Sequence, residues 1–308
     1  MTKQKNIHLL TFPTIAKCHE NIDFNKSKKI LIAGEDSYIG KSFKEYVSHF
    51  ANYRVDSFDT RKDEWKKMDF SIYDVVFDVA GITHVKETQK NRHLFYEVNR
   101  DLAVEIAKKA KSEGVGQFIY ISSMSVYGLL VGRINKSTPL KPVNAYGKSK
   151  LEAEMLLWQL NSKDFRVSIV RPPMVYGDNC KGNYQRLRSF ALRSFFFPEY
   201  DNERSMLYID NLSSAIRGII HNEEAGLYFP QDMSYVRTFD MVKAIAKANK
   251  KKCVGLKAIN LLIRQVMRKS DIFKKVFGTL TYEMCMNVPK SWILLDNFEE
   301  IINEAEGD

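Results

Sequence analysis

Tyr146 and Lys150 are two residues whose types and spacing could move a proton. Residues four apart on a helix share a face, so this phenol and this ammonium would be neighbours. A phenol with a pKa of about 10 is a poor base at neutral pH, and a cation held beside it lowers that pKa by favouring the phenolate. The pair therefore indicates acid–base catalysis.

Ser122 and Ser123 lie upstream of this pair, directly after the apolar run Phe118–Ile121. That run is typical of a buried strand, which would place both hydroxyls at the carboxyl end of the strand. Ligands of open α/β sheets bind at the carboxyl ends of the strands. We therefore expect the serines and the Tyr–Lys pair in one active site.

The loop Gly34–Gly40 follows the apolar run Ile30–Ala33 and precedes a segment in which apolar residues recur at helical spacing. Its sequence, Gly-Glu-Asp-Ser-Tyr-Ile-Gly, has the G-x-x-G-x-x-G spacing with serine in the middle place. Small residues there let the backbone turn sharply and approach a pyrophosphate that faces the amides of the helix N-terminus. The loop predicts a dinucleotide site lined by Gly34, Ser37, Tyr38, Ile39 and Gly40.

Asp59 ends the next predicted strand, 25 residues after Gly34. An acidic side chain at about this separation binds the ribose hydroxyls of the adenosine and favours NAD over NADP. Arg61, two residues later, could instead clamp the 2′-phosphate of NADP. Both are candidate cofactor residues, and Asp59 slightly favours NAD.

Apolar runs and helical segments alternate between Lys28 and Val170. Parallel strands need crossover connections, so this alternation predicts an α/β fold with a Rossmann-type doubly wound parallel sheet. After Val170 the alternation weakens, and aromatic and basic residues become frequent. We predict an N-terminal extension (1–27), an NAD(P)-binding Rossmann domain (28–178, with a return segment near 205–225) and a smaller, mainly substrate-binding C-terminal lobe (179–308).

Composition limits the class of protein. The 308 residues are 44% hydrophobic, as in a globular protein, and no apolar run approaches the length of about 20 residues that a membrane-spanning helix needs. The four cysteines are scattered without a C-x-x-C pair, which argues against a disulfide framework or a metal site. We expect a cytoplasmic protein that binds no metal.

The net charge of +10 is compatible with a nucleic-acid partner or with a small anionic substrate. Basic residues are spread along the chain, and the densest run, Lys250–Lys252, has no interleaved aromatic residues to stack on bases. We interpret that run as a solvated helix end and expect no nucleic-acid partner. The amphipathic segment Ile259–Phe277 could lie on a membrane surface or pack on the core, and we expect core packing.

Eight motifs, in this order and spacing, resemble the NAD-dependent epimerase/dehydratase family, the extended short-chain dehydrogenases that include UDP-galactose 4-epimerase. The resemblance covers about residues 28 to 225. The motifs are Gly34–Gly40, Val79–Gly81, Asn99, Ser122–Ser123, Val126–Gly128, Tyr146–Lys150, Arg171–Gly177 and Tyr208–Asn211.

The resemblance implies roles for single residues. Ser123 would hydrogen-bond the reacting oxygen, Tyr146 would be the acid/base, and Lys150 would hold the nicotinamide ribose and tune Tyr146. The cofactor would be NAD or NADP. The further cofactor contacts that it implies are Ala80, Gly81 and Asn99.

Substrate residues also follow from the resemblance. Asn183 and Arg204 match positions that meet a nucleotide diphosphate in the wider family, and a guanidinium can bind phosphate oxygens bidentately. Met174 stands where the 4-epimerases have an asparagine that contacts the sugar nucleotide, and Ser37 replaces the family's usual middle glycine. We expect a UDP-linked sugar as substrate and a homodimer as the assembly.

The segments around Arg171, Asn183 and Arg204 look like enzymes of bacterial capsule and O-antigen loci. The resemblance therefore predicts an NAD(P)-dependent nucleotide-sugar oxidoreductase that reduces the 4-keto group of a UDP-4-keto-6-deoxy-N-acetylhexosamine for surface polysaccharide biosynthesis. A UDP-hexose or N-acetylhexosamine 4-epimerase is the alternative, since both reactions need the same tyrosine, serine and nicotinamide. A non-catalytic dinucleotide sensor is a third reading, which the complete Ser–Tyr–Lys set disfavours.

Overall fold

The computed structural model describes residues 27–83, 85–284, 286–289, 292 and 294–307. The predicted N-terminal extension, 1–27, lies outside this range except for Ser27. Two of the four cysteines, Cys180 and Cys253, are described, and both are free thiols. Within the described range, no helix is both long and apolar enough to cross a bilayer.

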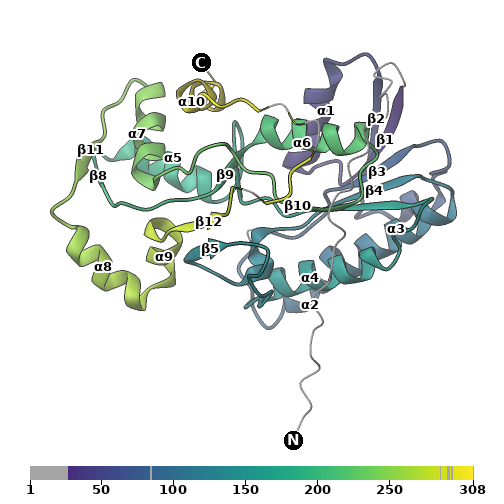
Figure 1. Ribbon diagram of the computed structural model, residues 1–308, viewed down its shortest axis with the longest axis horizontal. Helices are drawn as coiled ribbons and strands as arrows, with labels where there is room; N and C mark the ends of the chain where they lie inside the picture. The colour runs from purple at the N-terminus through teal and green to yellow at the C-terminus, as the bar shows by residue number, and fades with distance from the viewer. Residues whose placement is uncertain (1–26, 84, 285, 290–291, 293, 308) are drawn as a thin grey trace, which may run out of the picture.

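A six-stranded sheet forms the centre of the molecule (Figure 1). Its strands are β1 (Lys28–Ala33), β2 (Tyr53–Phe58), β3 (Val75–Asp78), β4 (Gln117–Ile121), β6 (Arg166–Val170) and β10 (Gly226–Tyr228). All neighbours pair in parallel, in the order β10-β6-β4-β3-β1-β2. The predicted Rossmann-type doubly wound parallel sheet is confirmed.

The strand order reverses at β1. The chain moves outward from β1 to β2 and then crosses back to β3, on the other side of β1. Ligands of doubly wound sheets bind at such a switch point, beyond the carboxyl ends of the strands. Gly34 follows β1 there and Ala80 follows β3, and a Cβ atom on Gly34 would lie 3.1 Å from the Ala80 nitrogen. The fold therefore places two predicted cofactor segments side by side.

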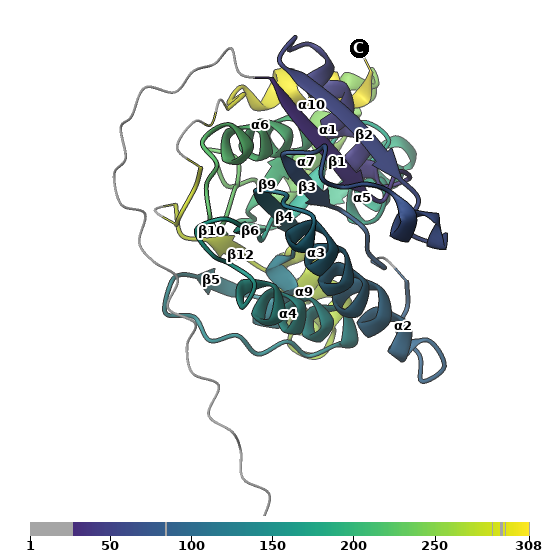
Figure 2. The same cartoon turned by 90° about the vertical axis from the view of Figure 1, so that its right-hand side faces the viewer.

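Helices cover both faces of the sheet (Figure 2). They are α1 (Tyr38–Ser48), α3 (Ala103–Ser112), α4 (Ala145–Trp158) and α6 (Ile209–His221). Ile30 and Ile32 of β1 share a core with α1 and α6, whereas Leu31 and Ala33 share a second core with α3 and α4. Because both faces of the strand are buried, it appears in the sequence as a continuous apolar run.

The remaining elements surround this layered unit. Four short helical elements belong to connections between β2 and β6 along the chain. They are η1 (Asp63–Lys67), α2 (Arg92–Tyr96), the π-helix η2 (Glu97–Leu102) and the 3-10 helix η3 (Met124–Tyr127). The others are β5 (Gly132–Ile134), β7 (Met174–Tyr176), α5 (Asn183–Arg193), β8 (Phe196–Pro198), β9 (Met206–Tyr208), α7 (Thr238–Ala248), β11 (Val254–Leu256), α8 (Asn260–Lys269), α9 (Asp271–Phe277), β12 (Leu280–Tyr282) and α10 (Phe298–Glu306).

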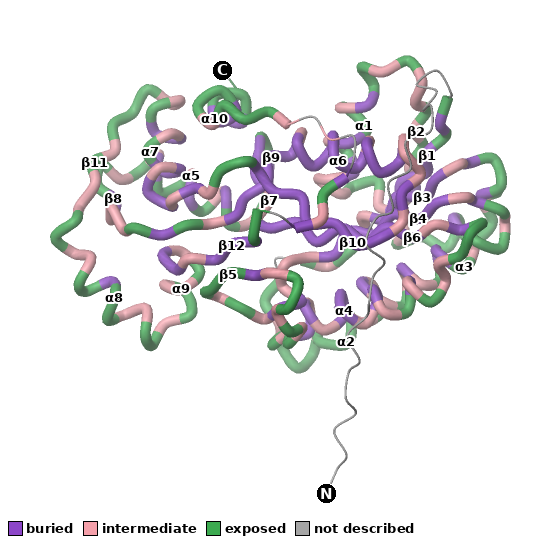
Figure 3. The backbone as a smooth tube through the Cα atoms, in the orientation of Figure 1, coloured by how far each residue is buried: buried purple, intermediate pink, exposed green. Residues whose placement is uncertain are grey.

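Three parallel strand pairs, β5–β12, β7–β9 and β8–β11, join segments that are far apart in the sequence. α5 and α10 both pack on α7, in the part of the molecule to the left of the sheet in Figure 1. Between α5 and α7 in the sequence, α6 and β10 lie on the sheet, where α6 packs on α1. Burial is concentrated along β3, β4, β6, β9 and α6, whereas α8 and α9 have long exposed stretches (Figure 3).

Candidate active site

The loop after β1 forms a cradle at the N-terminus of α1. Gly34 has a φ of +107°, a conformation that L side chains rarely adopt, and its nitrogen donates to the Phe58 oxygen at the end of β2. Ser37 is the N-cap of α1, but its side chain does not cap the helix, and the first turn holds no acidic residue. The Tyr38 side chain points away from this loop, and a Cβ atom on Gly177 would lie 2.8 Å from its hydroxyl. A close-approach glycine and a helix N-terminus without an acidic residue fit a dinucleotide pyrophosphate.

Asp59 and Arg61 lie together at the carboxyl end of β2. The Asp59 carboxylate accepts from the Arg61 Nε at 2.7 Å, and the same guanidinium reaches Asp36 of the cradle at 2.7 Å through Nη2. The hydrogen bonds from Arg61 hold the pKa of Asp59 below its usual value. The structure therefore brings together Asp59 and Arg61, the two residues predicted to bind the adenosine ribose or its 2′-phosphate. The carboxylates of Asp59 and Asp36 hold the guanidinium of Arg61 in place.

The predicted acid–base pair lies on the first turns of α4. The Asn144 side chain caps this helix by accepting from the Gly147 nitrogen at 2.8 Å, which fixes where the helix begins. One turn later, the Lys150 Nζ donates to the Ile121 oxygen at 2.8 Å and sits 4.4 Å from the centre of the Tyr120 ring. α4 is thus fastened to the carboxyl end of β4, where Ser122 and Ser123 follow.

Tyr146 faces Ser123 as the sequence predicts. Burial raises the pKa of the Tyr146 phenol, and hydrogen bonds with Ser123 and Thr83 oppose that rise by favouring the phenolate. The Ser123 hydroxyl also accepts from the Ser125 nitrogen at 3.1 Å, which fixes its position at the start of η3. Thr83 was not among the predicted residues, although it follows the Val79–Gly81 motif by only two positions.

Asp78 is a second residue that the sequence analysis missed. It ends β3, is 1% exposed, and accepts from the Ala80 nitrogen at 3.0 Å through Oδ1, while Oδ2 has no hydrogen-bond partner in the described structure. Burial raises the pKa of Asp78 to about 7 against the attraction of Lys150. Burial lowers the pKa of Lys150 to about 8, and the charges of Asp78 and Glu154 oppose that shift. A lone acidic residue that closes an otherwise apolar strand was the available signal.

Asn99 is fully buried in the π-helix η2, and its side chain hydrogen-bonds to the backbone of the loop after β3. Its Oδ1 accepts from the Ile82 nitrogen at 2.8 Å, and its Nδ2 donates to the Ile82 oxygen and to the Ser149 hydroxyl, each at 3.2 Å. A Cβ atom on Gly81 would lie 3.0 Å from that Oδ1 and 3.4 Å from the Lys150 Nζ. Asn99 therefore holds Gly81 against α4, and its direct contact with a cofactor stays a prediction.

A buried ion pair lies beneath Ser122 and joins α4 to the segments that follow β4 and β6. Arg171 and Glu154 are 2% and 0% exposed, and the Arg171 Nε donates to Glu154 at 2.9 Å. The Ser122 hydroxyl donates to the same carboxylate, and Arg171 also donates to the Tyr127 hydroxyl at 3.0 Å. Because every charge is paired and hydrogen-bonded, this network joins α4, β4 and β6 into one rigid support.

The two predicted substrate residues lie beyond this support. Arg204 donates from Nη1 to the Gly278 oxygen at 2.9 Å, and burial lowers the pKa of its guanidinium to about 10. Among the described residues, no carboxylate forms an ion pair with Arg204. Asn183 is exposed at the first residue of α5, and no described contact joins it to Arg204. Met174 begins β7 and is half-buried.

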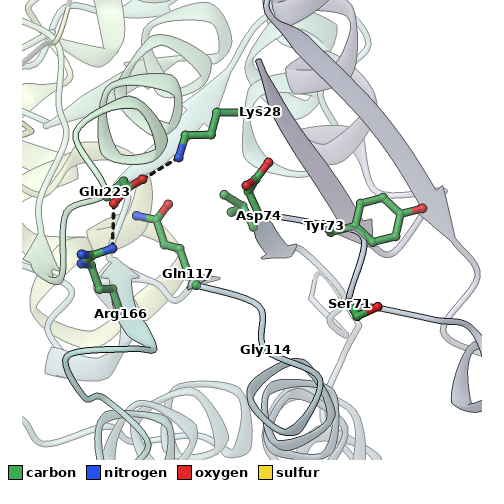
Figure 4. Close-up of a pocket in the computed structure, with 10 residues that line it drawn as sticks. Lys28, Ser71, Tyr73, Asp74, Gly114, Gln117, Arg166 and Glu223 are labelled. Carbon is green, nitrogen blue, oxygen red and sulfur yellow. Dashed lines mark hydrogen bonds and ion pairs between the residues drawn. The ribbon is translucent and has the colours of Figure 1, made fainter. Parts of the chain in front are cut away.

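A separate cavity of about 270 Å³ lies at the opposite, amino end of the sheet (Figure 4). Lys28, Gln117 and Arg166, from the starts of three strands, line it together with Glu223. Glu223 pairs with Lys28 at 2.6 Å and with Arg166 at 2.8 Å, so the charges in this cavity are matched within the protein. Over the described residues, no cluster of His, Cys, Asp and Glu suited to a metal ion occurs.

Known proteins resemble this chain in sequence. UDP-glucose 4-epimerase of Vibrio cholerae is 30% identical over 292 residues, which cover 85% of this chain and 89% of the relative. The N-acetyl-alpha-D-glucosaminyl-diphospho-ditrans,octacis-undecaprenol 4-epimerase of Escherichia coli O157:H7 is 26% identical over 215 residues, or 64% of each chain.

Solved structures resemble it in fold. UDP-glucuronic acid 4-epimerase from Bacillus cereus, in complex with NAD, has a TM-score of 0.69 at 16% identity and covers 90% of this chain and 97% of its own. RMD from Pseudomonas aeruginosa, complexed with NADPH, has a TM-score of 0.68 at 18% identity, with coverages of 91% and 98%. The model of the NAD dependent epimerase/dehydratase family matches residues 30–227. That match and the Vibrio relative confirm the resemblance of the motifs, and the chain is a member of the NAD-dependent epimerase/dehydratase family.

Proposed function

We propose that this chain catalyses NAD-dependent oxidation or reduction at carbon 4 of a UDP-linked hexose. The observation that carries the proposal is the position of Tyr146, which faces Ser123 and Thr83 one helical turn from Lys150, while Lys150 lies against Gly81 in the loop after β3. Tyr146 gives a proton to the sugar oxygen or takes one from it, while Ser123 holds that oxygen by a hydrogen bond. A nicotinamide dinucleotide held by the loop Gly34–Gly40 would supply the hydride chemistry. Lys150 favours the phenolate form of Tyr146.

The finer proposal is reduction of the 4-keto group of a UDP-4-keto-6-deoxy-N-acetylhexosamine for surface polysaccharide. Its support is Met174, which stands in β7 where the family resemblance expects the asparagine of the 4-epimerases. A thioether cannot donate the hydrogen bonds of an amide, so the sugar nucleotide would be held differently.

Epimerisation at carbon 4 is the second candidate, and the Vibrio cholerae relative named as a UDP-glucose 4-epimerase favours it. Both reactions use the same protein groups, so the cofactor cycle separates them. A reductase releases oxidised cofactor after each turnover, whereas an epimerase regenerates its cofactor in place and can hold it throughout.

We expect the purified protein to oxidise added NADH or NADPH when it is given a UDP-4-keto-6-deoxy-N-acetylhexosamine, in proportion to the keto sugar supplied. Absorbance at the reduced nicotinamide band measures the consumption, and mass spectrometry identifies the nucleotide sugar produced. The epimerase candidate would replace the reductase if the protein retained stoichiometric NAD, interconverted UDP-hexose 4-epimers and consumed no reduced cofactor.

For the cofactor, the proposal is NAD. Asp59 supports it, because its carboxylate would bind ribose hydroxyls and repel a 2′-phosphate, while Arg61 is already paired with Asp59 and Asp36. Asp59→Ser removes the repulsion and frees part of Arg61, so we expect the ratio of NADP to NAD affinity to rise by about tenfold or more. Fluorescence titration of both cofactors measures this ratio.

The matched control for this experiment adds Arg61→Ala to Asp59→Ser. The double variant lacks the guanidinium that would clamp the 2′-phosphate, so it should lose most of the gained NADP affinity. A wild-type protein that already binds NADP more tightly than NAD would contradict the assignment of NAD.

Arg204 is proposed to bind the diphosphate of the sugar nucleotide. Arg204→Ala should weaken binding of UDP-sugar by roughly 1.5 to 3 kcal/mol, the range for hydrogen bonds to a charged group. Arg204→Lys, which keeps the charge but loses the planar fork, should lose less. Calorimetry with UDP-sugar and with NAD checks both, and an equal loss for the two ligands would indicate a folding defect instead.

A further inference from the structure

Exposed apolar side chains gather at the end of the molecule formed by α5, β8 and β11. Phe190, Phe195 and Phe196 are 59%, 53% and 51% exposed, and Val254 is 43% exposed. β8 and β11 pair in parallel with Val254 opposite Phe196, and the Val254 nitrogen donates to the Phe195 oxygen at 2.9 Å. The rings of Phe195 and Phe196 are 5.0 Å apart. Phe195, Phe196 and Val254 therefore form one contiguous patch, here called the lobe tip. Phe190 of α5 packs on the neighbouring Phe197 of β8, with ring centroids 6.2 Å apart.

The lobe tip is bordered by positive charge. Arg193, Lys251 and Lys252 line a shallow hollow of about 260 Å³ together with Phe195, and no acidic residue lines it. The Lys251 Nζ donates to the Leu192 oxygen at 2.6 Å. Across the described residues, none of Arg193, Lys250, Lys251 and Lys252 forms an ion pair with a carboxylate. The cations are thus free to meet an external anion.

The fold places the exposed phenylalanines at 195 and 196 beside the lysine run Lys250–Lys252, which lies far from them in the sequence. The phenylalanines and the lysine run are more than 50 residues apart, so the run Lys250–Lys252 had no aromatic neighbours in the sequence analysis. α8 begins shortly after β11 and is largely exposed: Leu261 and Leu262 are 69% and 60% exposed, and Ile263 alone in this helix is buried. The expected core packing of 259–277 therefore holds for only part of the segment (Figure 3).

Two properties of the lobe tip decide what partner it fits. Monomeric proteins rarely leave several large apolar side chains exposed side by side, so the patch indicates an interaction surface. The unpaired cations around it favour an anionic partner. A nucleic acid would pair with the lysines but leave the aliphatic side chain of Val254 in water. A bilayer with acidic headgroups offers negative charge at its surface and an apolar boundary just below it.

We propose that the lobe tip docks on an anionic membrane surface, with Phe195 and Phe196 inserted at headgroup depth and Lys251 and Lys252 on the headgroups. Docking of this kind is peripheral and reversible, and it weakens as salt screens the lysines. It is independent of which reaction the enzyme catalyses.

The test is sedimentation of the full chain with vesicles of phosphatidylcholine alone or of equal parts phosphatidylcholine and phosphatidylglycerol. We expect binding to the acidic vesicles only, and weaker binding at high salt. Phe195→Ser with Phe196→Ser, and separately Lys251→Glu with Lys252→Glu, should each reduce that binding by at least about tenfold. Because these side chains are largely exposed, the variants should keep the melting temperature and NAD affinity of the wild type.

Matched controls are Ile72→Ser and Lys67→Glu, which change an exposed apolar and an exposed basic residue far from the lobe tip. Both should bind acidic vesicles like the wild type. The proposal is overturned if acidic vesicles do not bind the chain or if the tip variants bind as well as the controls. It is equally overturned if the tip variants change only oligonucleotide binding, or only the mass in light scattering, which would make the tip a nucleic-acid site or an interface between copies.

Discussion

Replacing Tyr146 by phenylalanine is expected to lower turnover by at least about 100-fold, the range for a lost acid–base group. The substitution deletes the only proton that the side chain can transfer and keeps the ring that fills its place between Ser123 and Thr83. The cradle at Gly34 is unchanged, so NAD affinity should stay as in the wild type.

Steady-state kinetics and NAD titration on the same preparation measure both effects. Tyr73→Phe is the matched control, because it removes a hydroxyl that bonds Asp56 at the amino side of the sheet and should retain turnover. Turnover of Tyr146→Phe within a few-fold of the wild type would show that another group is the acid–base.

Replacing Asp78 by asparagine is expected to make activity fall at a lower pH than in the wild type. In the proposed mechanism a charged Lys150 favours the phenolate of Tyr146, and the pKa of Lys150 is already lowered to about 8 by burial, with Asp78 opposing that shift. Without the Asp78 charge the pKa of Lys150 falls further, by about one to three units for an opposite charge at close range. Glu154, the other carboxylate that raises the pKa of Lys150, is neutralised in part by Arg171.

The size of the loss of activity in Asp78→Asn depends on pH. Asp78 has a pKa of about 7, so below that pH the wild type also carries a neutral side chain there, and the two proteins should converge. Above it, the variant should lose about fivefold or more in kcat at pH 8. Asparagine keeps the acceptor for the Ala80 nitrogen, so the fold should be unaffected. A kcat profile between about pH 5.5 and 9 measures this, and parallel profiles would mean that Asp78 is only structural.

Local patterns were enough to predict most of the half that holds the six-stranded sheet. The two-residue period with both faces buried gives β1 and β4 as unbroken apolar runs, and the spacing of four brings Tyr146 and Lys150 to one side of a helix. The loop Gly34–Gly40 also has a local signature, because Gly34 has a positive φ and a side chain on Gly40 would press on Ile32 and Val79.

Contacts between distant segments could not be predicted in this way. Thr83 and Asp78 reach Tyr146 and Lys150 only because β3 lies beside β4, and one sequence does not state which strands are neighbours. The same holds for the lobe tip, where a short parallel pairing unites Phe196 with Val254. The periodicity of apolar side chains indicates which face of an element is buried, but not which other element packs on that face.

The π-helix η2 has a consequence for how this chain can vary. α2, η2 and α3 are contiguous, and the wider turn between Glu97 and Leu102 lets Asn99 point at the loop after β3 while Ala103 and Ile106 still face the sheet. Each residue of an α-helix turns the chain by about 100°. Losing or gaining a single residue in this stretch would therefore swing the whole apolar stripe of α3 away from the sheet. The packing of α3 on the sheet therefore constrains the number of residues between α2 and α3 as strictly as it constrains which residues they are.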